Sequence, residues 1–457
     1  MRTKPRLKGC PSLYNVPIQF AGKISRQAPE ADLLLCFLRF VEDNAASLGI
    51  AFEETEKLDA IGQAYGTAFF PITQLVPHVV KVAQKLGMDA AAFTDYTNAI
   101  APDSFKHAFS EFGFSSGGLC LEHSEEAGDY LFNFIMDTGT VERRSPGFES
   151  DEAFELTACV LERLCSNQQP LPEATSATQQ AHSNERTLRV AFHACKDARL
   201  VCLSFRHLRS SRPKMCACSN DGIAVAIISM LLLFLGYRDG YDLVRKGYIV
   251  SHGFDAVVLE YSPERETTSL RDVDDGIRTV SQGKTGIIFG KPDVFLRPDE
   301  STLVRKHLVE NPNVASHCDL FGDYGDSRSL TILQQEPSNR KDLFLMRITG
   351  GDWQKNAPEE FSDGYFPWLA EVIANQRDVP TLSAHINRER IAAQDDVSLN
   401  LADYMDDGGQ GTSLAVSSES LISLAEQYKQ AITDLREADD AFATALGRLA
   451  KAETASW

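Results

Sequence analysis

The stretch LLLFLGYRDGYDLVRKGYIVSHGFDAVVLEYSP, from Leu231 to Pro263, decides the fold that the sequence predicts. It begins with an apolar run and continues as two alternating segments separated by Ser-His-Gly. Alternation that is rich in β-branched and aromatic residues is typical of strands, and Gly253 supplies a turn. We therefore predict a β-hairpin with strands from about Leu243 to Val250 and from about Ala256 to Tyr261.

The apolar run before the hairpin predicts a buried helix. It extends from Ile223 to Leu235 and has 13 residues, whereas a membrane-spanning helix needs about 20. Asp221 can cap the start of the helix, and Gly236 can end it in the left-handed conformation. A membrane anchor is therefore not expected here.

Composition limits the class of protein. The 457 residues leave room for several domains, and 45 basic against 64 acidic residues give a net charge of −19. This charge argues against a general phosphate-binding surface and suits protein partners. The ten cysteines have no framework-like spacing, and the N-terminus lacks the apolar core of a secretion signal. We expect reduced thiols in a cytosolic or nuclear protein.

Periodicity divides the chain into helical and strand-rich regions. Helical spacing is found in residues 28–44 and in most of 52–165, and a polar, Pro-bearing segment follows. Later segments alternate or run apolar, and these predict strands. The predicted domains are 1–48 (first strand and helix), 49–165 (helical insertion), 166–186 (linker), 187–385 (barrel core), 386–417 (linker) and 418–457 (coiled-coil-like helix).

The strand-rich region predicts an α+β fold, in which an antiparallel β-barrel-like sheet is flanked by helices. Its predicted strands include RTLRVAFHA, ARLVCLSFRHL, TGIIFG, DVFL, SLTILQQ and KDLFLMRITG, with HCDLFGDYGDSRS as a surface loop and FPWLAEVIANQ as a closing helix. In the C-terminal tail, apolar residues recur every seven positions at Leu421, Tyr428, Leu435, Phe442 and Leu449. This stripe fits either packing on the same chain or a seam with a partner helix.

Motifs for catalysis and metal binding are weak. Ser115 in GFSSG lacks the preceding strand that a nucleophile elbow needs, and QGKTG around Lys284 lacks the first glycine of a phosphate loop. Zinc ligands are offered by His193, Cys195, Cys202, His207, Cys216 and Cys218. The first four lie on predicted strands, where alternation places them on two faces. We expect no cofactor and no metal.

The opening stretch resembles the family of Mediator complex subunit 18. The likeness lies in the turn Leu235-Gly236-Tyr237, the pair Lys246-Gly247, Gly253, and the strand from Val257 to Tyr261. IQFAGKISRQAPEADLLLCFLRFVEDN is similar to the opening strand and helix of that family, LVCLSFRHL to the strand before its central helix, and KDLFLMRITG with FPWLAEVIANQ to its late strand and closing helix.

The resemblance implies a non-catalytic interaction subunit of the nuclear Mediator coactivator. Such a chain would pair with subunit 20, dock a helix of subunit 8, lie near subunit 17 and assist RNA polymerase II, without membrane contact or direct sequence-specific nucleic-acid contact. Candidate partner-binding residues are Phe205, Tyr237, Tyr248, Tyr261, Leu421, Tyr428, Leu435 and Phe442, with core packing as the alternative for each of the first four.

Two other hypotheses remain open. Closed antiparallel barrels can hydrolyse triphosphates with inward glutamates that hold a divalent metal, and Glu260, Glu264 and Glu266 are the candidates in this chain. Glu264 and Glu266 follow Pro263 and are therefore expected in a turn. The second hypothesis is an adaptor that binds its partners through the helical region 52–165.

Overall fold

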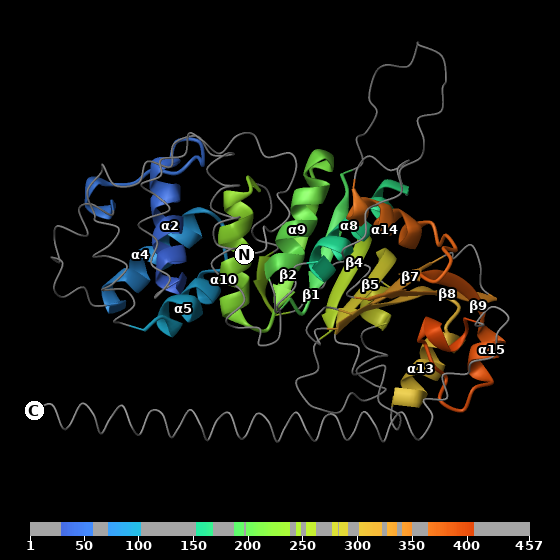
Figure 1. Cartoon of the computed structure of the whole chain (residues 1–457). Coiled ribbons are helices and arrows are strands. Elements are labelled where there is room, and N and C mark those ends of the chain that lie inside the picture. Colours follow the sequence, from blue (N-terminus) through green and yellow to red (C-terminus); the bar gives the residue numbers. More distant parts are fainter. Residues whose placement is uncertain are drawn as a thin grey trace, which may run out of the picture. The chain divides into compact units, whose positions relative to one another are not determined.

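The computed structural model describes thirteen segments of the chain (Figure 1). They are residues 29–57, 72–101, 152–167, 187–195, 198–237, 244–247, 253–261, 277–281, 283–290, 301–321, 327–335, 341–349 and 364–405. The chain divides into two units, 1–403 and 404–457, and the first contains all the elements below. The predicted strand at 14–24, the motif around Ser115 and the C-terminal heptads lie outside the described residues.

The described strands form one open sheet, which corrects the predicted antiparallel barrel. They are β1 (Arg189–His193), β2 (Lys214–Ser219), β3 (Val244–Lys246), β4 (Phe254–Tyr261), β5 (Gly283–Gly290), β6 (Val314–Phe321), β7 (Ser327–Gln334), β8 (Asp342–Ile348) and β9 (Ser383–Asn387). Their order is β3-β2-β1-β4-β5-β7-β6-β8-β9, so β3 and β9 are the edges. Pairing is parallel except that β7 runs against β5 and β6, and β9 runs against β8.

The predicted hairpin is wrong, although both of its strands exist. β3 pairs with β2 and β4 pairs with β1, both in parallel, so two strands separate the supposed partners. Gly253 does have the positive φ of 85° that favours glycine. It directly precedes β4, however, and joins no hairpin, because β3 and β4 are not neighbours in the sheet.

One face of the sheet is covered by α8 (Glu152–Asn167), α9 (Ala198–Leu208) and α14 (Tyr365–Ala374). Phe154 of α8 packs on Phe289 of β5 with ring centroids 5.1 Å apart, and both side chains belong to the main core. The segment 198–208 was predicted as a strand and is the helix α9. A short apolar run such as Leu200–Leu203 is compatible with a strand or with a buried helix. In the structure this segment is helical and packs on α8.

Helix α10 (Gly222–Phe234) confirms the predicted buried helix and both of its ends. Asp221 caps it by accepting a hydrogen bond from the Ile223 N–H at 2.9 Å. At the other end Gly236 has φ 88°, its N–H bonds the carbonyl of Leu233, and the Tyr237 N–H bonds that of Leu232. This pair of bonds is the Schellman pattern. Among the described residues, no helix is long and apolar enough to cross a membrane.

The helices α2 (Pro29–Asp43), α4 (Ile72–Lys85) and α5 (Ala90–Ala99) pack beyond α10, near the β3 edge (Figure 1). Phe40 of α2 meets Phe234 of α10 edge to face at 5.2 Å, and α5 also contacts α10 directly. A short 3₁₀ turn, η2 (Glu54–Glu56), joins this group, and another, η4 (Arg209–Ser211), follows α9. Helical spacing in the sequence predicted α2, α4 and α8, and the structure confirms them.

The opposite face of the sheet carries a second apolar layer with α13 (Ser301–Glu310), α15 (Arg388–Ala392) and the turn η6 (Leu401–Asp403). Gly286 of β5 lies against the short helical turn at 277–280, where an added Cβ would fall 2.6 Å from the Cβ of Val280. The segment predicted as a surface loop begins inside β6, which is almost fully buried. His317 and Asp319 misled the prediction, because polar residues are seldom so deeply buried.

Candidate ligand site at the carboxyl edge of the sheet

The topology singles out one place for a ligand. The chain builds β1, β2 and β3 outward in one direction and then returns to place β4 on the other side of β1. In open α/β sheets, ligands bind beyond the carboxyl ends of the strands at this switch point. The end of β1, together with its neighbours in β2 and β4, is therefore the candidate site.

The turn after β1 is tightly held and contains no glycine. Ala194 takes the left-handed conformation with φ 54°, and the Cys195 N–H donates to the Cys218 carbonyl at 3.1 Å. His193 is 6% exposed, and its Nδ1 lies 3.7 Å from Cys218 Sγ. Within the described part of the chain, no hydrogen-bond partner reaches its buried Nε2. Burial lowers the pKa of His193, so this ring is a neutral polar group at the strand end.

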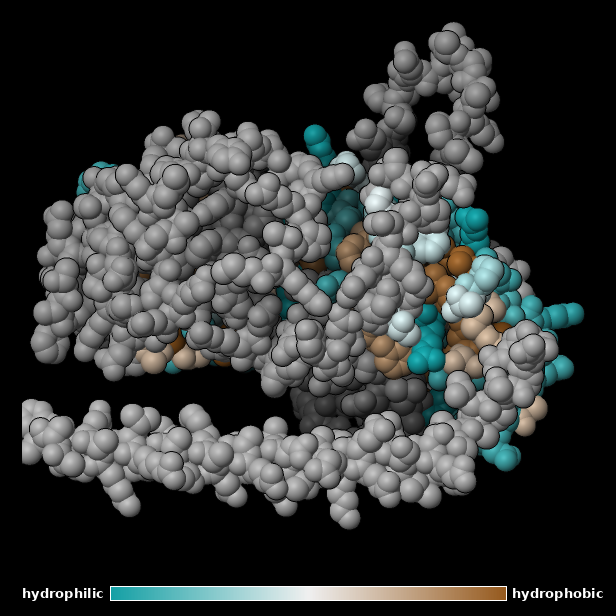
Figure 2. All heavy atoms as spheres, viewed as in Figure 1, coloured by the Kyte–Doolittle hydropathy of each residue, from teal (hydrophilic) through white to brown (hydrophobic). Residues whose placement is uncertain are grey.

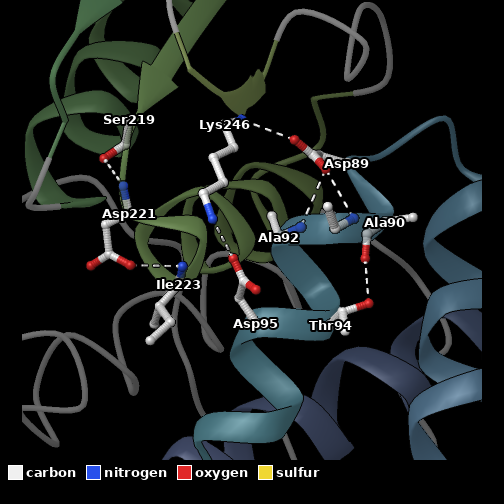
Figure 3. Close-up of polar contacts among 10 residues, drawn as sticks. Asp89, Ala90, Ala92, Thr94, Asp95, Ser219, Asp221, Ile223 and Lys246 are labelled. Carbon is white, nitrogen blue, oxygen red and sulfur yellow. Dashed lines mark hydrogen bonds and ion pairs between the residues drawn. The ribbon is translucent and has the colours of Figure 1, made fainter.

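The end of β2 presents oxygen atoms. The Ser219 carbonyl accepts the Gly247 N–H at 2.8 Å, and Ser219 Oγ accepts the Asp221 N–H at 3.1 Å. One carboxylate oxygen of Asp221 caps α10, and Figure 3 draws the other carboxylate oxygen turned away from this contact. The cap fixes the carboxylate just beyond the strand, about where dinucleotide-binding sheets place the acid that bonds a ribose.

Lys246, the last residue of β3, ties the N-terminal helices to this edge (Figure 3). Its N–H donates to Asp89 at 2.9 Å and its Nζ to Asp95 at 2.8 Å. Asp89 also caps α5 through Ala91 and Ala92. The hydrogen bond and charge of Asp95 raise the pKa of Lys246. Lys246 thus joins the start of α5 to the carboxyl end of β3 through its backbone N–H and its side chain.

Close packing completes this junction. An added Cβ on Gly222, the first residue of α10, would fall 2.3 Å from the Asp95 carboxylate. Only glycine therefore leaves room for Asp95 where Lys246 binds it. Sequence reasoning missed this group, because residues some 150 positions apart share no local pattern.

Glu260 closes the site on the β4 side. It is 5% exposed and lies one residue before the end of the strand, paired in register with Phe289. Burial, followed by the charge of Glu260, raises the pKa of Cys195 well above its usual value. The thiol therefore stays protonated and is a poor nucleophile. The site combines a neutral imidazole and a protonated thiol at the end of β1 with two acids, one after β2 and one on β4, the strands on either side of β1.

The predicted zinc ligands do not assemble as one set. His193 and Cys218 meet at 3.7 Å, whereas His207 lies on α9 beside Cys159 of α8. Cys195, Cys202 and Cys216 are buried cysteines. Lys284, from the phosphate-loop motif, lies in β5 with its Nζ 3.5 Å from Asp255. That motif is part of a strand and not a loop.

Two of the predicted partner-binding residues belong to the core. Phe205 and Tyr237 are 5% and 4% exposed and pack edge to face at 5.3 Å. Tyr261 ends β4, while Tyr248 and the four heptad residues Leu421, Tyr428, Leu435 and Phe442 lie outside the described residues. Partner contact by any of these residues stays a prediction.

Few described apolar side chains remain on the surface. Figure 2 shows hydrophobic and hydrophilic residues interspersed on the visible described surface. Among the described residues, Leu303 is the large hydrophobic side chain that is mostly exposed, at 56%. A pocket of about 240 Å³ lies at the amino end of β5, lined by Gly283, Gly286, Asn313 and Gln334 among others. It is remote from the carboxyl ends of the parallel strands.

Comparison with known proteins identifies the fold. No family model matches the chain, and no curated protein matches it. The similar solved structures include a type I restriction-modification system methyltransferase subunit from Streptococcus thermophilus. It is 10% identical, the match covers 84% of this chain and 96% of that one, and the TM-score is 0.58. At this identity the likeness establishes the fold alone, and the chain has a Rossmann-like methyltransferase fold.

Two further structures are more distant. A structure concerning complex assembly and conformational transition of the type I restriction-modification system is 12% identical, with coverage of 91% and 93% and a TM-score of 0.49. The type I restriction enzyme EcoKI M protein is 12% identical, with coverage of 83% and 85% and a TM-score of 0.35.

These findings overturn the functional expectations. The fold contradicts the resemblance to Mediator subunit 18, and with it the interaction-subunit function and the partners (subunits 20, 8 and 17 and the RNA polymerase II machinery). The hypothesis of a triphosphate hydrolase is also contradicted. It required a closed barrel, whereas Glu260 lies in an open, largely parallel sheet. The expectation of a non-enzyme is contradicted as well, since the fold is that of methyltransferase subunits. The nuclear localisation stays a prediction.

Proposed function

We propose that this chain is a methyltransferase-fold subunit that binds a nucleoside-bearing ligand, with the methyl donor S-adenosylmethionine as the candidate that the fold implies. The site is the carboxyl edge at β1, β2 and β4. The observation that carries the proposal is the strand order, which makes the carboxyl ends of β1 and β4 the switch point and puts His193, Asp221 and Glu260 at or next to the ends of β1, β2 and β4.

The end of β2 fits the nucleoside half of such a ligand. A carboxylate can accept both hydroxyls of a ribose, and Asp221 is held beyond the strand by its contact with α10. The buried Nε2 of His193, which has no hydrogen-bond partner among the described residues, offers a further polar contact. A ligand that supplied this partner would remove the cost of leaving a buried polar atom unpaired.

The turn after β1 differs from a glycine-rich ligand loop. Glycines in that position let the backbone approach the ligand closely, whereas here Ala194 and Cys195 carry side chains into the turn. We therefore place the ligand over Ser219 and Asp221 and not against the backbone of the β1 turn. When bound, S-adenosylmethionine supplies an electrophilic methyl group. In this arrangement Glu260 of β4, on the other side of β1, is the acid that would face a methyl acceptor.

The nature of the methyl acceptor is constrained by charge. The net charge of −19 disfavours broad contact with a phosphate backbone. If the acceptor is nucleic acid, as the names of the similar structures suggest, a basic partner subunit would have to supply most of the phosphate contacts.

Isothermal titration of the full chain with S-adenosylmethionine, S-adenosylhomocysteine, adenosine and ATP tests the proposal. We expect binding of the first two. Hydrogen bonds to charged groups contribute about 1.5–3 kcal/mol, so Asp221→Ala should weaken binding by at least about tenfold. Asp221→Asn keeps a good helix cap and should weaken binding less. Glu310→Gln neutralises an exposed acid on α13 and should bind like the wild type.

Three outcomes would overturn the proposal. They are no binding of S-adenosylmethionine by folded protein, binding of ATP alone, or an equal effect of Asp221→Ala and Glu310→Gln. Circular dichroism of each variant separates a lost site from a lost fold.

A further inference from the structure

A cluster of metal-ligating side chains lies between α8 and α9, apart from the proposed ligand site. Glu155, Cys159 and Glu162 occupy positions i, i+4 and i+7 of α8 and therefore share one face of that helix. His207, in the last turn of α9, projects onto this face. Glu155, Cys159 and His207 each offer one ligand atom, and these atoms lie within 4.8 Å of one another.

Two of the distances between the ligand atoms are close to those in a tetrahedral zinc centre. His207 Nε2 is 2.9 Å from Glu155 Oε1 and 3.7 Å from Cys159 Sγ. Zinc bonds of about 2.0–2.3 Å at tetrahedral angles place a nitrogen about 3.3 Å from an oxygen and about 3.5 Å from a sulfur. The third pair, Glu155 and Cys159, has its ligand atoms within 4.8 Å, so side-chain adjustment would bring all three atoms around one ion.

A fourth residue orients the imidazole. The other ring nitrogen of His207, Nδ1, is 3.2 Å from Glu162 Oε2. Histidines that bind zinc commonly donate their second N–H to a carboxylate, which fixes the ring and makes the ligating nitrogen more basic. Glu162 stands in that position with respect to an ion bound at Nε2.

The surroundings suit a cation that enters from solvent. Cys159 is 3% exposed, whereas the side chains of His207, Glu155 and Glu162 are 22%, 21% and 39% exposed. The carboxylates of Glu155 and Glu162 both face the imidazole of His207, and one side of the cluster is open to water.

We infer that Cys159, His207 and Glu155 form a binding site for Zn²⁺, with Glu162 orienting His207 and water as the fourth ligand. Three protein ligands with an open fourth position distinguish this site from a closed four-ligand structural site. The bound ion would join α8 to α9, the two helices that lie before and after β1 in the chain.

Titration of chelator-treated full-length protein with Co²⁺ tests this inference, since Co²⁺ replaces Zn²⁺ and reports its ligands by absorption. We expect one equivalent to bind, with a thiolate-to-cobalt charge-transfer band and the visible bands of tetrahedral cobalt, and Zn²⁺ to abolish both. Cys159→Ser should lose the charge-transfer band. Cys165→Ser, a buried thiol on the same helix, should keep it.

Two further variants distinguish ligands from neighbours. His207→Gln should lose tight binding, while Glu162→Gln should keep the cobalt spectrum but weaken binding by about 10–100-fold. A spectrum without a charge-transfer band in wild-type protein, or one that survives Cys159→Ser in folded protein, would overturn the inference. Neither result bears on binding of S-adenosylmethionine.

Discussion

The hydroxyl of Tyr237 is expected to stabilise strand β2, because it bonds the backbone of Met215. β3 is a short edge strand that pairs with β2 only from Ala217 to Ser219. The backbone of Met215 lies before this stretch. Its carbonyl accepts the Tyr237 hydroxyl at 3.1 Å, and its N–H donates to the same oxygen at 3.2 Å. The Tyr237 hydroxyl thus bonds both backbone groups of Met215, beyond the described pairing of β2 with β3.

Tyr237→Phe removes this hydroxyl and keeps the ring contact with Phe205. The variant leaves one N–H and one carbonyl of a buried strand without partners, because Met215 is fully buried. An unsatisfied buried polar group costs about 1–3 kcal/mol. We therefore expect Tyr237→Phe to lower the free energy of unfolding by about 2–4 kcal/mol, with partial relaxation included.

Urea denaturation at unchanged m-value measures this loss. Tyr96→Phe is the matched control, because its hydroxyl donates to the Glu30 carbonyl at 2.8 Å in a part-buried position. The control should lose about 1 kcal/mol. A Tyr237→Phe variant within about 0.5 kcal/mol of wild type would refute the reasoning. It would also revive partner contact as the reason for a tyrosine at this position.

Three further predictions concern the junction at the carboxyl edge and the N-terminal helices. Gly222→Ala should displace Asp95 from Lys246 and speed hydrogen exchange in α5, while exchange in the sheet stays unchanged. Exchange in α5 at the wild-type rate would contradict the close packing of Gly222 on Asp95. Asp221→Ala should lose about 0.5–2 kcal/mol of stability in urea and Asp221→Asn much less, since asparagine also caps helices. Burial lowers the pKa of His78 to about 4. Between pH 6.5 and 4 the unfolded chain therefore binds the proton that the folded chain excludes, so stability should fall on acidification through this window. His78→Gln should flatten that part of the pH profile, and an unchanged profile would exclude His78 as its cause.

Local signals in the sequence predicted single elements well. Asp221 and Gly236 marked both ends of α10, and helical spacing identified α2, α4, α8 and α14. Capping and amphipathic spacing act within a few residues, so one sequence carries them in full. Most strand segments were also recognised, because β-branched and aromatic runs are local as well.

Which strands pair with each other could not be predicted from local signals in the sequence. Assigning 198–208 to a strand removed one helix from the alternation of helices and strands that indicates a parallel sheet. With that helix lost, Gly253 between two strands was taken for a hairpin turn. The candidate site could not be predicted from the sequence for the same reason. His193, Asp221 and Glu260 come to one end of the sheet only when β2, β1 and β4 lie side by side in parallel.

Hydrogen–deuterium exchange of the full chain, with and without saturating S-adenosylmethionine, locates the ligand site on the sheet. We expect slower exchange in peptides covering the turn after β1 and the junction of β2 with α10, with little change in α13 and β9. Unchanged exchange at the carboxyl ends of β1 and β2, or protection confined to α13 and β9, would contradict this location of the site.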